Sequence, residues 1–181
     1  MNANTVTASE GSMKEVQNHI HGLRAQITAH PFAHGLSHEY VAILADCAME
    51  TQFAPGELIF REGEFANRFY FLLEGEVALE SQAKGEPVTI ESIGAGDVLG
   101  WSWLFPPYDW HFSARAVKPT RAIFFYGTWL RQYCEQNCDL GYELIKRTAE
   151  VMVRRLQATR RRLGTALAGE SEGNEMTKKF D

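Results

Sequence analysis

Between residues 53 and 100 the chain reads Phe53-Ala-Pro-Gly-Glu-Leu-Ile-Phe-Arg-Glu-Gly-Glu64, then Phe69-Tyr-Phe-Leu-Leu-Glu-Gly-Glu-Val77, then Gly94-Ala-Gly-Asp-Val-Leu-Gly100. Short apolar runs of this kind continue to Tyr126, and turn residues separate them at intervals of about 8 to 12 positions. Short strands between such turns are typical of a β-sandwich or a β-roll. No helix-length pattern interrupts the runs, which argues against a parallel α/β sheet.

The residues before this region predict two helices. Apolar side chains recur at helical spacing within residues 14–28, at Val16, Ile20, Leu23 and Ile27. We therefore expect an amphipathic helix that Pro31 ends, followed by a short helix with Ser37 as its N-cap. Residues 1–13 are polar, and we expect a disordered tail there.

A long helix is expected after the strands. Its apolar positions follow a heptad spacing: Ile145, Ala149, Met152, Leu156, Thr159, Leu163 and Ala166. Such a seam predicts dimerisation through Ile145, Ala149, Met152, Leu156 and Leu163. Residues 140–163 hold seven Lys or Arg and two Glu, a charge of +5, so the rest of the chain carries −10. We expect residues 14–139 to form the β-region with its helices, residues 140–166 the basic helix, and residues 167–181 a second disordered tail.

Composition excludes several classes of protein. The chain has 181 residues, 45% of them hydrophobic, with a formal net charge of −5. This acidity argues against a surface that binds duplex nucleic acid, and no apolar run approaches the ~20 residues that span a bilayer. The first residues lack the basic and apolar regions of a signal peptide, and three cysteines fit a reducing compartment. We therefore expect a cytoplasmic protein without a membrane segment.

The three glycine-containing stretches, in this order, resemble the cyclic nucleotide-binding domain of catabolite-activator-type regulators, kinase regulatory subunits and gated channels. The resemblance covers roughly residues 32–163. It implies an α+β, mainly β fold: a double-stranded β-helix or jelly-roll-like β-roll with N-terminal helices and a long C-terminal helix.

In this family the segment after the third stretch is a phosphate-binding cassette. The resemblance implies a Glu that accepts the ribose hydroxyl directly after Gly100, and an Arg about nine residues later that pairs with the cyclic phosphate. Trp101 and Trp110 stand at these two positions, and His111 stands where the family often has Ser or Thr. The candidate pocket residues, in a degenerate cassette, are Gly100, Trp101, Ser102, Trp110, His111 and Ser113.

The two tryptophans argue against ordinary cyclic AMP binding. A phosphate taken out of water needs a cation or several N–H groups, and an indole offers one N–H where Arg offers a charged fork. Protonated His111 could replace part of this charge, which would favour binding at low pH. Arg115 has the strand parity opposite to Trp110, so we expect it outside the pocket. We expect no cofactor, with a cyclic nucleotide as the open alternative.

The aromatic residues of this cassette have two interpretations. They either fill the pocket themselves or form an exposed lip that contacts a partner through Trp103, Phe105 and Tyr108, stiffened by Pro106-Pro107. Stacking on a nucleotide base is a third possibility.

The sequence shows no pattern that predicts a metal, cysteine, nucleophilic or DNA-binding site. His19, His21, His30, His34 and His38 lack acidic or cysteine partners at ligand spacing, so we predict no metal site. Cys134 and Cys138 have a packing or a redox role. No Gly-x-Ser-x-Gly or Ser/His/Asp arrangement offers a nucleophile. The family's transcriptional regulators continue into a winged helix-turn-helix, whereas 18 residues follow Leu163 here, so we expect no direct DNA binding.

These observations predict a non-catalytic regulatory module that senses a small ligand, such as a nucleotide, or has lost it. The alternative is an accessory subunit of a larger redox complex that docks through its aromatic loop. The Gly-Trp-Ser-Trp-Leu-Phe-Pro-Pro-Tyr segment is similar to that of subunits accompanying NAD-reducing hydrogenases. The expected partner is correspondingly a second copy, joined through the C-terminal helix, or the other subunits of a hetero-oligomeric enzyme.

Overall fold

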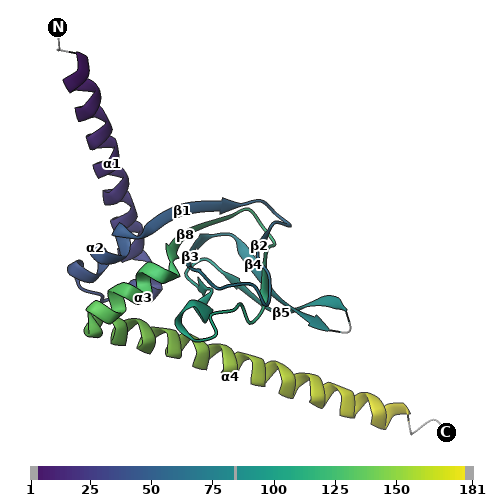
Figure 1. The fold of residues 1–181 in the computed structure, drawn as a ribbon. Helices are drawn as coiled ribbons and strands as arrows, with labels where there is room; N and C mark the ends of the chain where they lie inside the picture. The colour runs from purple at the N-terminus through teal and green to yellow at the C-terminus, as the bar shows by residue number, and fades with distance from the viewer. Residues whose placement is uncertain (1–3, 84, 178–181) are drawn as a thin grey trace. The chain divides into compact units, whose positions relative to one another are not determined.

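The structure is a computed structural model. It describes the backbone of residues 4–83 and 85–177 and the side chains of residues 17–82 and 85–165. The chain divides into two units between Gly141 and Tyr142; the first holds the described strands and the second most of the last helix. Figure 1 shows the order of the elements along the chain.

In the described part of the chain, eight strands form two antiparallel four-stranded sheets. The first sheet consists, in spatial order, of β1 (Ala48–Phe53), β8 (Thr120–Tyr126), β3 (Arg68–Glu74) and β6 (Val98–Leu99). The second consists of β2 (Leu58–Phe60), β7 (Ser113–Ala116), β4 (Glu76–Ala83) and β5 (Glu86–Gly94). The predicted β-roll with flanking helices is confirmed.

The two sheets enclose the apolar core of the roll. Strand residues alternate between the two faces of a sheet, so every second side chain points inward. On β4 the inward side chains of Val77 and Leu79 are buried, and on β7 Ala114 and Ala116 are buried. The alternate β7 residue Arg115 pairs instead with Glu80 outside this core. This alternation decides which residues of the cassette can reach the interior.

The N-terminal segment packs on the first sheet. It consists of α1 (Asn4–Ala29), the 3₁₀ turn η1 (Pro31–Ala33) and α2 (His38–Asp46). Phe32 of η1 is buried and its ring lies 5.3 Å from the rings of both Phe69 and Phe71 on β3. The Ser37 hydroxyl accepts a hydrogen bond of 3.2 Å from the Tyr40 N–H, so the predicted N-cap of α2 is confirmed.

Both terminal helices extend further than the sequence predicts. Helix α1 begins at Asn4 instead of Lys14, and α4 (Cys138–Thr177) continues through most of residues 167–181. The structure describes residues 4–13 and 167–177 as helical, the remaining tail residues lie outside the described ones, and the disordered tails over residues 1–13 and 167–181 stay a prediction. A helix can continue into polar sequence because adding a turn to a helix that has already formed costs far less than starting one.

A short helix, α3 (Gly127–Gln136), joins β8 to α4. Its last turn ends at Asn137, whose N–H donates to the Tyr133 carbonyl. Across the described residues, none of the helices combines the length and the apolar character that a membrane crossing would require.

Candidate functional site

The cassette region runs from the end of β6 to the start of β7 and includes the 3₁₀ turn η2 (Trp101–Leu104). Gly100 precedes this turn with φ +86°, a left-handed conformation that favours glycine. A Cβ at Gly100 would lie 2.8 Å from Cζ3 of Trp110 and 3.0 Å from the Arg68 carbonyl oxygen. The backbone can thus turn here only because it carries no side chain, which leaves the space to the Trp110 indole.

Trp110 fills part of the roll interior. Its side chain is 4% exposed, and its indole stacks on the Phe60 ring with centroids 3.8 Å apart and planes inclined by 11°. Both residues belong to the apolar cluster between the sheets, which also contains Tyr70, Leu79 and Phe112. The position that the family resemblance assigns to a phosphate-binding Arg is therefore occupied by a packed aromatic side chain.

Trp101 covers the same interior from its edge. It is half-buried, with ring centroids 6.3 Å from Phe105 and 6.2 Å from Phe112. The exposed His111 ring stacks on Trp101 at 5.5 Å, and Nδ1 of His111 lies 2.9 Å from the hydroxyl of the fully buried Ser102. The structure thus brings together Gly100, Trp101, Ser102, Trp110 and His111, five of the six predicted pocket residues.

Ser113 is the exception and corrects the sequence prediction. It follows the buried Phe112 and precedes the buried Ala114, so strand alternation places its side chain on the outer face of β7. Its hydroxyl accepts a hydrogen bond of 3.0 Å from the Glu62 N–H. Arg115 lies on the same outer face, as predicted, and its Nε donates to both carboxylate oxygens of Glu80 at 3.2 and 3.3 Å.

One of the three residues expected to form an exposed aromatic lip, Trp103, is buried. Trp103 is 1% exposed and its ring lies 5.9 Å from Phe69, so it belongs to the core and cannot contact a partner. Its close packing depends on Gly127, because a Cβ there would lie 2.8 Å from Cβ of Trp103. The tight turn η2 directs this side chain inward, which motif spacing alone does not reveal.

The remaining lip residues lie at the surface. Phe105 is 38% exposed, and Tyr108 is half-buried beneath the Arg131 guanidinium, 4.4 Å above its ring. Two further aromatic residues that the sequence did not single out, Phe65 and Trp129, are 55% and 50% exposed. They are separate in sequence from the Trp-rich segment, and no pattern marked them.

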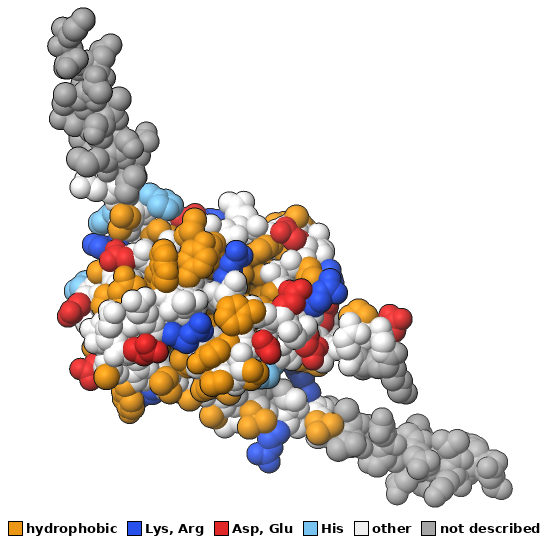
Figure 2. Space-filling view, viewed as in Figure 1, with side chains coloured by type: hydrophobic (Ala, Val, Ile, Leu, Met, Phe, Trp, Pro, Cys, Tyr) orange, Lys and Arg blue, Asp and Glu red, His pale blue; other side chains and the backbone are white. Residues whose placement is uncertain are grey.

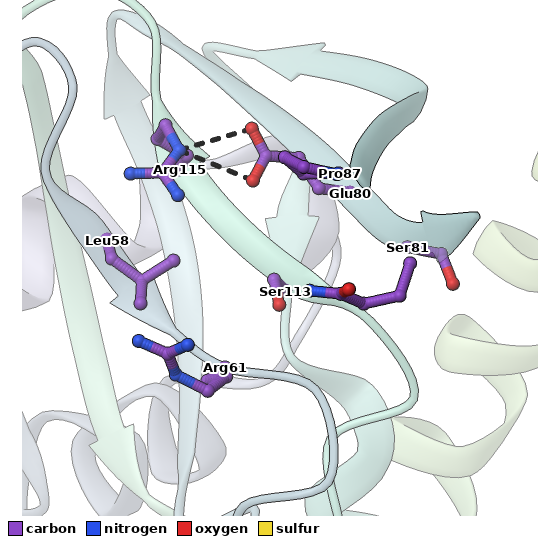
Figure 3. A pocket seen from close by; sticks show the side chains of 8 residues that line it. Leu58, Arg61, Glu80, Ser81, Pro87, Ser113 and Arg115 are labelled. Atoms are coloured by element: carbon purple, nitrogen blue, oxygen red, sulfur yellow. Dashed lines mark hydrogen bonds and ion pairs between the residues drawn. The ribbon is translucent and has the colours of Figure 1, made fainter. Parts of the chain in front are cut away.

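The outer face of the second sheet carries a pocket of about 220 Å³, shown in Figure 3. Its lining residues come from all four strands and their connections: Leu58, Arg61, Glu80, Ser81, Gln82, Pro87, Ser113 and Arg115. Of these residues, the sequence predicted only Ser113 as a binding residue, and it placed Ser113 in the roll interior instead of on the outer face. The alternation of side chains along β7 was the signal that could have placed it correctly.

The cysteines of the described residues are free thiols. Cys134 is half-buried and Cys138 exposed, and neither forms a disulfide. No three His, Cys, Asp or Glu side chains among the described residues are grouped so that they could hold a metal ion.

Comparisons with known proteins agree with the fold of the roll. The sequence model of the cyclic nucleotide-binding domain matches residues 50–137. A solved structure from Geobacter metallireducens, a candidate cyclic nucleotide-binding protein, is 34% identical; the match covers 69% of this chain and 91% of that chain with a TM-score of 0.63. The catabolite activator protein of Thermus thermophilus is 22% identical, with 75% and 62% covered and a TM-score of 0.60, and shares the fold.

A curated relative is a CRP-like cAMP-activated global transcriptional regulator of Mycobacterium tuberculosis. It is 24% identical over 140 residues, which are 77% of this chain and 61% of the relative. The chain thus spans about three fifths of the length of this relative. By its sequence and by its fold, this chain belongs to the cyclic nucleotide-binding domain family.

Proposed function

We propose that the chain is a non-catalytic regulatory module whose roll is filled by its own aromatic side chains, so that it does not bind a cyclic nucleotide in the family's usual way. The stacking of buried Trp110 on Phe60 carries this proposal. The relatives found are regulators or cyclic nucleotide-binding domains, which supports a regulatory role.

A cyclic phosphate in the roll interior would lack its usual partners. Burial of a phosphate costs several kcal/mol unless charged donors receive it. The buried members of the interior cluster are apolar side chains, apart from the Tyr70 hydroxyl and the indole N–H of Trp110. Neither group carries the positive charge that a phosphate needs.

One cation does lie at the edge of this cluster. The Arg68 guanidinium is 4.8 Å above the Phe124 ring, and Arg68 opposes the rise that burial causes in the pKa of Tyr70. No ion pair joins Arg68 to another described residue. If a nucleotide did enter the roll, Arg68 and His111 would be the residues to receive its phosphate.

Isothermal titration with cyclic AMP and cyclic GMP, at about pH 6 and pH 8, tests the proposal. We expect no binding heat at either pH from protein whose folding is checked by circular dichroism. Micromolar binding would overturn the filled-roll proposal. Arg68→Gln and His111→Gln would then identify the cation, with tighter binding at the lower pH pointing to His111.

An accessory-subunit role is the second candidate, and the exposed Phe105 and Phe65 favour it. The Ala66 N–H donates to the Tyr108 carbonyl, and Phe65 pairs with Asp109, so these two exposed rings come from segments joined by backbone hydrogen bonds. Figure 2 shows several groups of hydrophobic side chains on the viewed face, with charged and other side chains between them. Large rigid aromatic side chains are enriched at interface centres.

Co-purification from the source cells tests this second role. We expect a tagged chain to retain defined redox-enzyme subunits, and Phe105→Asp to lose them. Val117→Asp is the matched control, because Val117 is 46% exposed at the β7–β8 turn. Equal retention by both variants would exclude the aromatic loop as the docking site.

We also propose that a second copy joins through α4. Ile145, Leu156 and Leu163 are 49%, 62% and 59% exposed, so these large apolar positions of the seam are open to a partner. Seam positions buried against a second helix would each contribute about 1–2 kcal/mol, offset by the entropy lost on association.

A further inference from the structure

The pocket on the outer face of the second sheet contains hydrogen-bond donors that no described residue uses. It lies opposite the roll interior, because Ser113 and Arg115 alternate along β7 with buried Ala114 and Ala116. Figure 3 shows Arg61 and Arg115 facing the same space from either side of Leu58, with Ser113 beside them.

Arg115 keeps free donors although it is held in place. Its Nε donates to both oxygens of Glu80, and its Nη1 donates to the Gly56 carbonyl at 3.0 Å. Its Nη2 makes no hydrogen bond or ion pair with a described residue. The arginine is therefore oriented by two partners, and because it lines the pocket, its Nη2 group is available to a ligand there.

Ser113 supplies a second oriented donor. Its oxygen accepts from the Glu62 N–H at 3.0 Å, which leaves its hydroxyl hydrogen without an acceptor among the described residues. Ser81 differs, because its hydroxyl donates to the Glu62 carboxylate at 3.1 Å. The pocket thus presents the Ser113 hydroxyl as a donor and the Ser81 oxygen as an acceptor.

Arg61 supplies a second, exposed positive charge. Its side chain is 64% exposed, and its only ion pair with a described residue is a 3.9 Å contact to Glu64, which is itself 61% exposed. An exposed pair at this distance contributes little, so Arg61 can turn to a ligand at small cost. Together with Arg115 it offers two guanidinium groups, and a guanidinium fork matches the two oxygens of a carboxylate.

The local charge distinguishes a carboxylate from a phosphate. The positive charges of Arg61 and Arg115 stand against the negative charges of three carboxylates: Glu80 in the pocket, Glu62, which Ser81 contacts, and Glu64, which pairs with Arg61. A singly charged ligand adds one negative charge to this acidic surrounding, whereas a doubly charged phosphate adds two. Leu58 and Pro87 add apolar surface, and about 220 Å³ is the volume of roughly seven water molecules.

We propose that this pocket binds a short aliphatic carboxylate, with Arg61, the Nη2 group of Arg115 and the Ser113 hydroxyl as its donors. The site is separate from the roll interior and does not depend on whether a nucleotide binds there.

Titration with sodium propionate tests the proposal by nuclear magnetic resonance of the full chain at constant ionic strength. We expect saturable shifts of the Arg115 Nε–H and of the Glu62 and Ser113 amides. Arg61→Gln should weaken propionate binding about tenfold or more, because it removes a charged hydrogen-bond donor to the carboxylate. The exposed Arg61 makes this substitution safe for folding, which the thermal midpoint verifies.

Arg24→Gln is the matched control. Arg24 is also exposed, at 47%, and also makes a single 3.9 Å ion pair, with Asp46, but it lies outside the pocket. Equal weakening by both variants would show general charge attraction and overturn the proposal. Chemical shifts that change linearly with the propionate concentration, without saturation, would also overturn the proposal. Inorganic phosphate that binds as tightly as propionate would overturn the assignment of a carboxylate.

Discussion

Gly100 and Trp110 are in such close contact that a methyl group on Gly100 would lie 2.8 Å from Cζ3 of the indole. Gly100→Ala therefore adds overpacking, at about 1–3 kcal/mol, to the ~1–2 kcal/mol cost of a left-handed residue with a Cβ. Gly35→Ala isolates the second cost, because Gly35 has φ +80° and no atom within 4 Å of a built Cβ. In urea unfolding, Gly100→Ala should lower the free energy of unfolding clearly more than Gly35→Ala does. Equal losses would mean that the contact with Trp110 relaxes without cost.

The stacking of Trp110 on Phe60 predicts a large loss of stability when the indole is removed. Trp110→Ala should lower the free energy of unfolding by about 3–5 kcal/mol, the range for a buried aromatic residue. Trp129→Ala, at 50% exposure, should cost far less. Comparable losses for the two variants in urea unfolding would contradict the description of Trp110 as a core residue.

The strands of the roll were predictable where glycines and apolar runs mark them. Strands β3, β4 and β8 include the runs at residues 68–73, 76–80 and 121–125. Strand β1 could not be predicted from its sequence, Ala48-Met-Glu-Thr-Gln-Phe53, because apolar and polar residues do not alternate clearly in it. Its stability comes from pairing with β8, about 70 residues away. Strand β6 has two residues, too few for any periodic signal.

The candidate site was predictable only in part, for a related reason. Trp101, Trp110 and His111 stand at positions that the family motif assigns to the binding cassette, and the structure brings them together. The motif placed Ser113 in the roll pocket. Its alternation with Phe112 and Ala114 along the strand indicates the outer face instead. The pocket with Arg61 is invisible to motif reasoning, because its residues come from separate strands that meet only in the folded sheet.

A buried histidine predicts how stability depends on pH. His30 is 4% exposed and stacks on Phe71 at 4.4 Å, and its Nδ1 accepts from the Phe32 N–H, so its ring is neutral. Burial lowers its pKa below 6.5, against smaller opposing effects of the Leu72 and Asp97 carbonyls and the Asp97 charge. Below pH 6.5 the unfolded chain therefore binds more protons at His30 than the folded chain does. The contribution of neutral His30 to the free energy of unfolding is present above pH 6.5 and is lost as the pH falls through the folded pKa.

The free energy of unfolding at about pH 7.5 and pH 5 measures this effect. His30→Asn removes the titrating ring, so the variant should lose less stability on acidification than the wild type. His19→Gln, at an exposed histidine, is the control and should behave as the wild type. An unchanged pH dependence in His30→Asn would rule out His30 as a source of acid sensitivity.

The three cysteines should differ in reactivity. Burial raises the pKa of Cys47 to about 12 and that of Cys134 to about 11, whereas Cys138 is exposed. The thiolate is the reactive form, so iodoacetamide at about pH 8 should label Cys138 first and Cys47 last. Mass spectrometry of the digested protein gives the order, and labelling in urea should make the three rates similar. Early labelling of Cys47 in the folded protein would contradict its burial.

The exposed apolar positions of α4 predict a dimer that charge weakens. Leu156→Asp should make the protein monomeric in sedimentation, because it places a carboxylate in the proposed seam. Val153→Asp is the control, since Val153 is 52% exposed on the same helix but outside the heptad positions. Residues 140–163 carry +5 in each copy, so raising the salt from about 0.05 M to about 0.3 M should tighten the wild-type dimer by screening their repulsion. A wild-type monomer at both salt concentrations would exclude the seam, as would equal dissociation of the two variants.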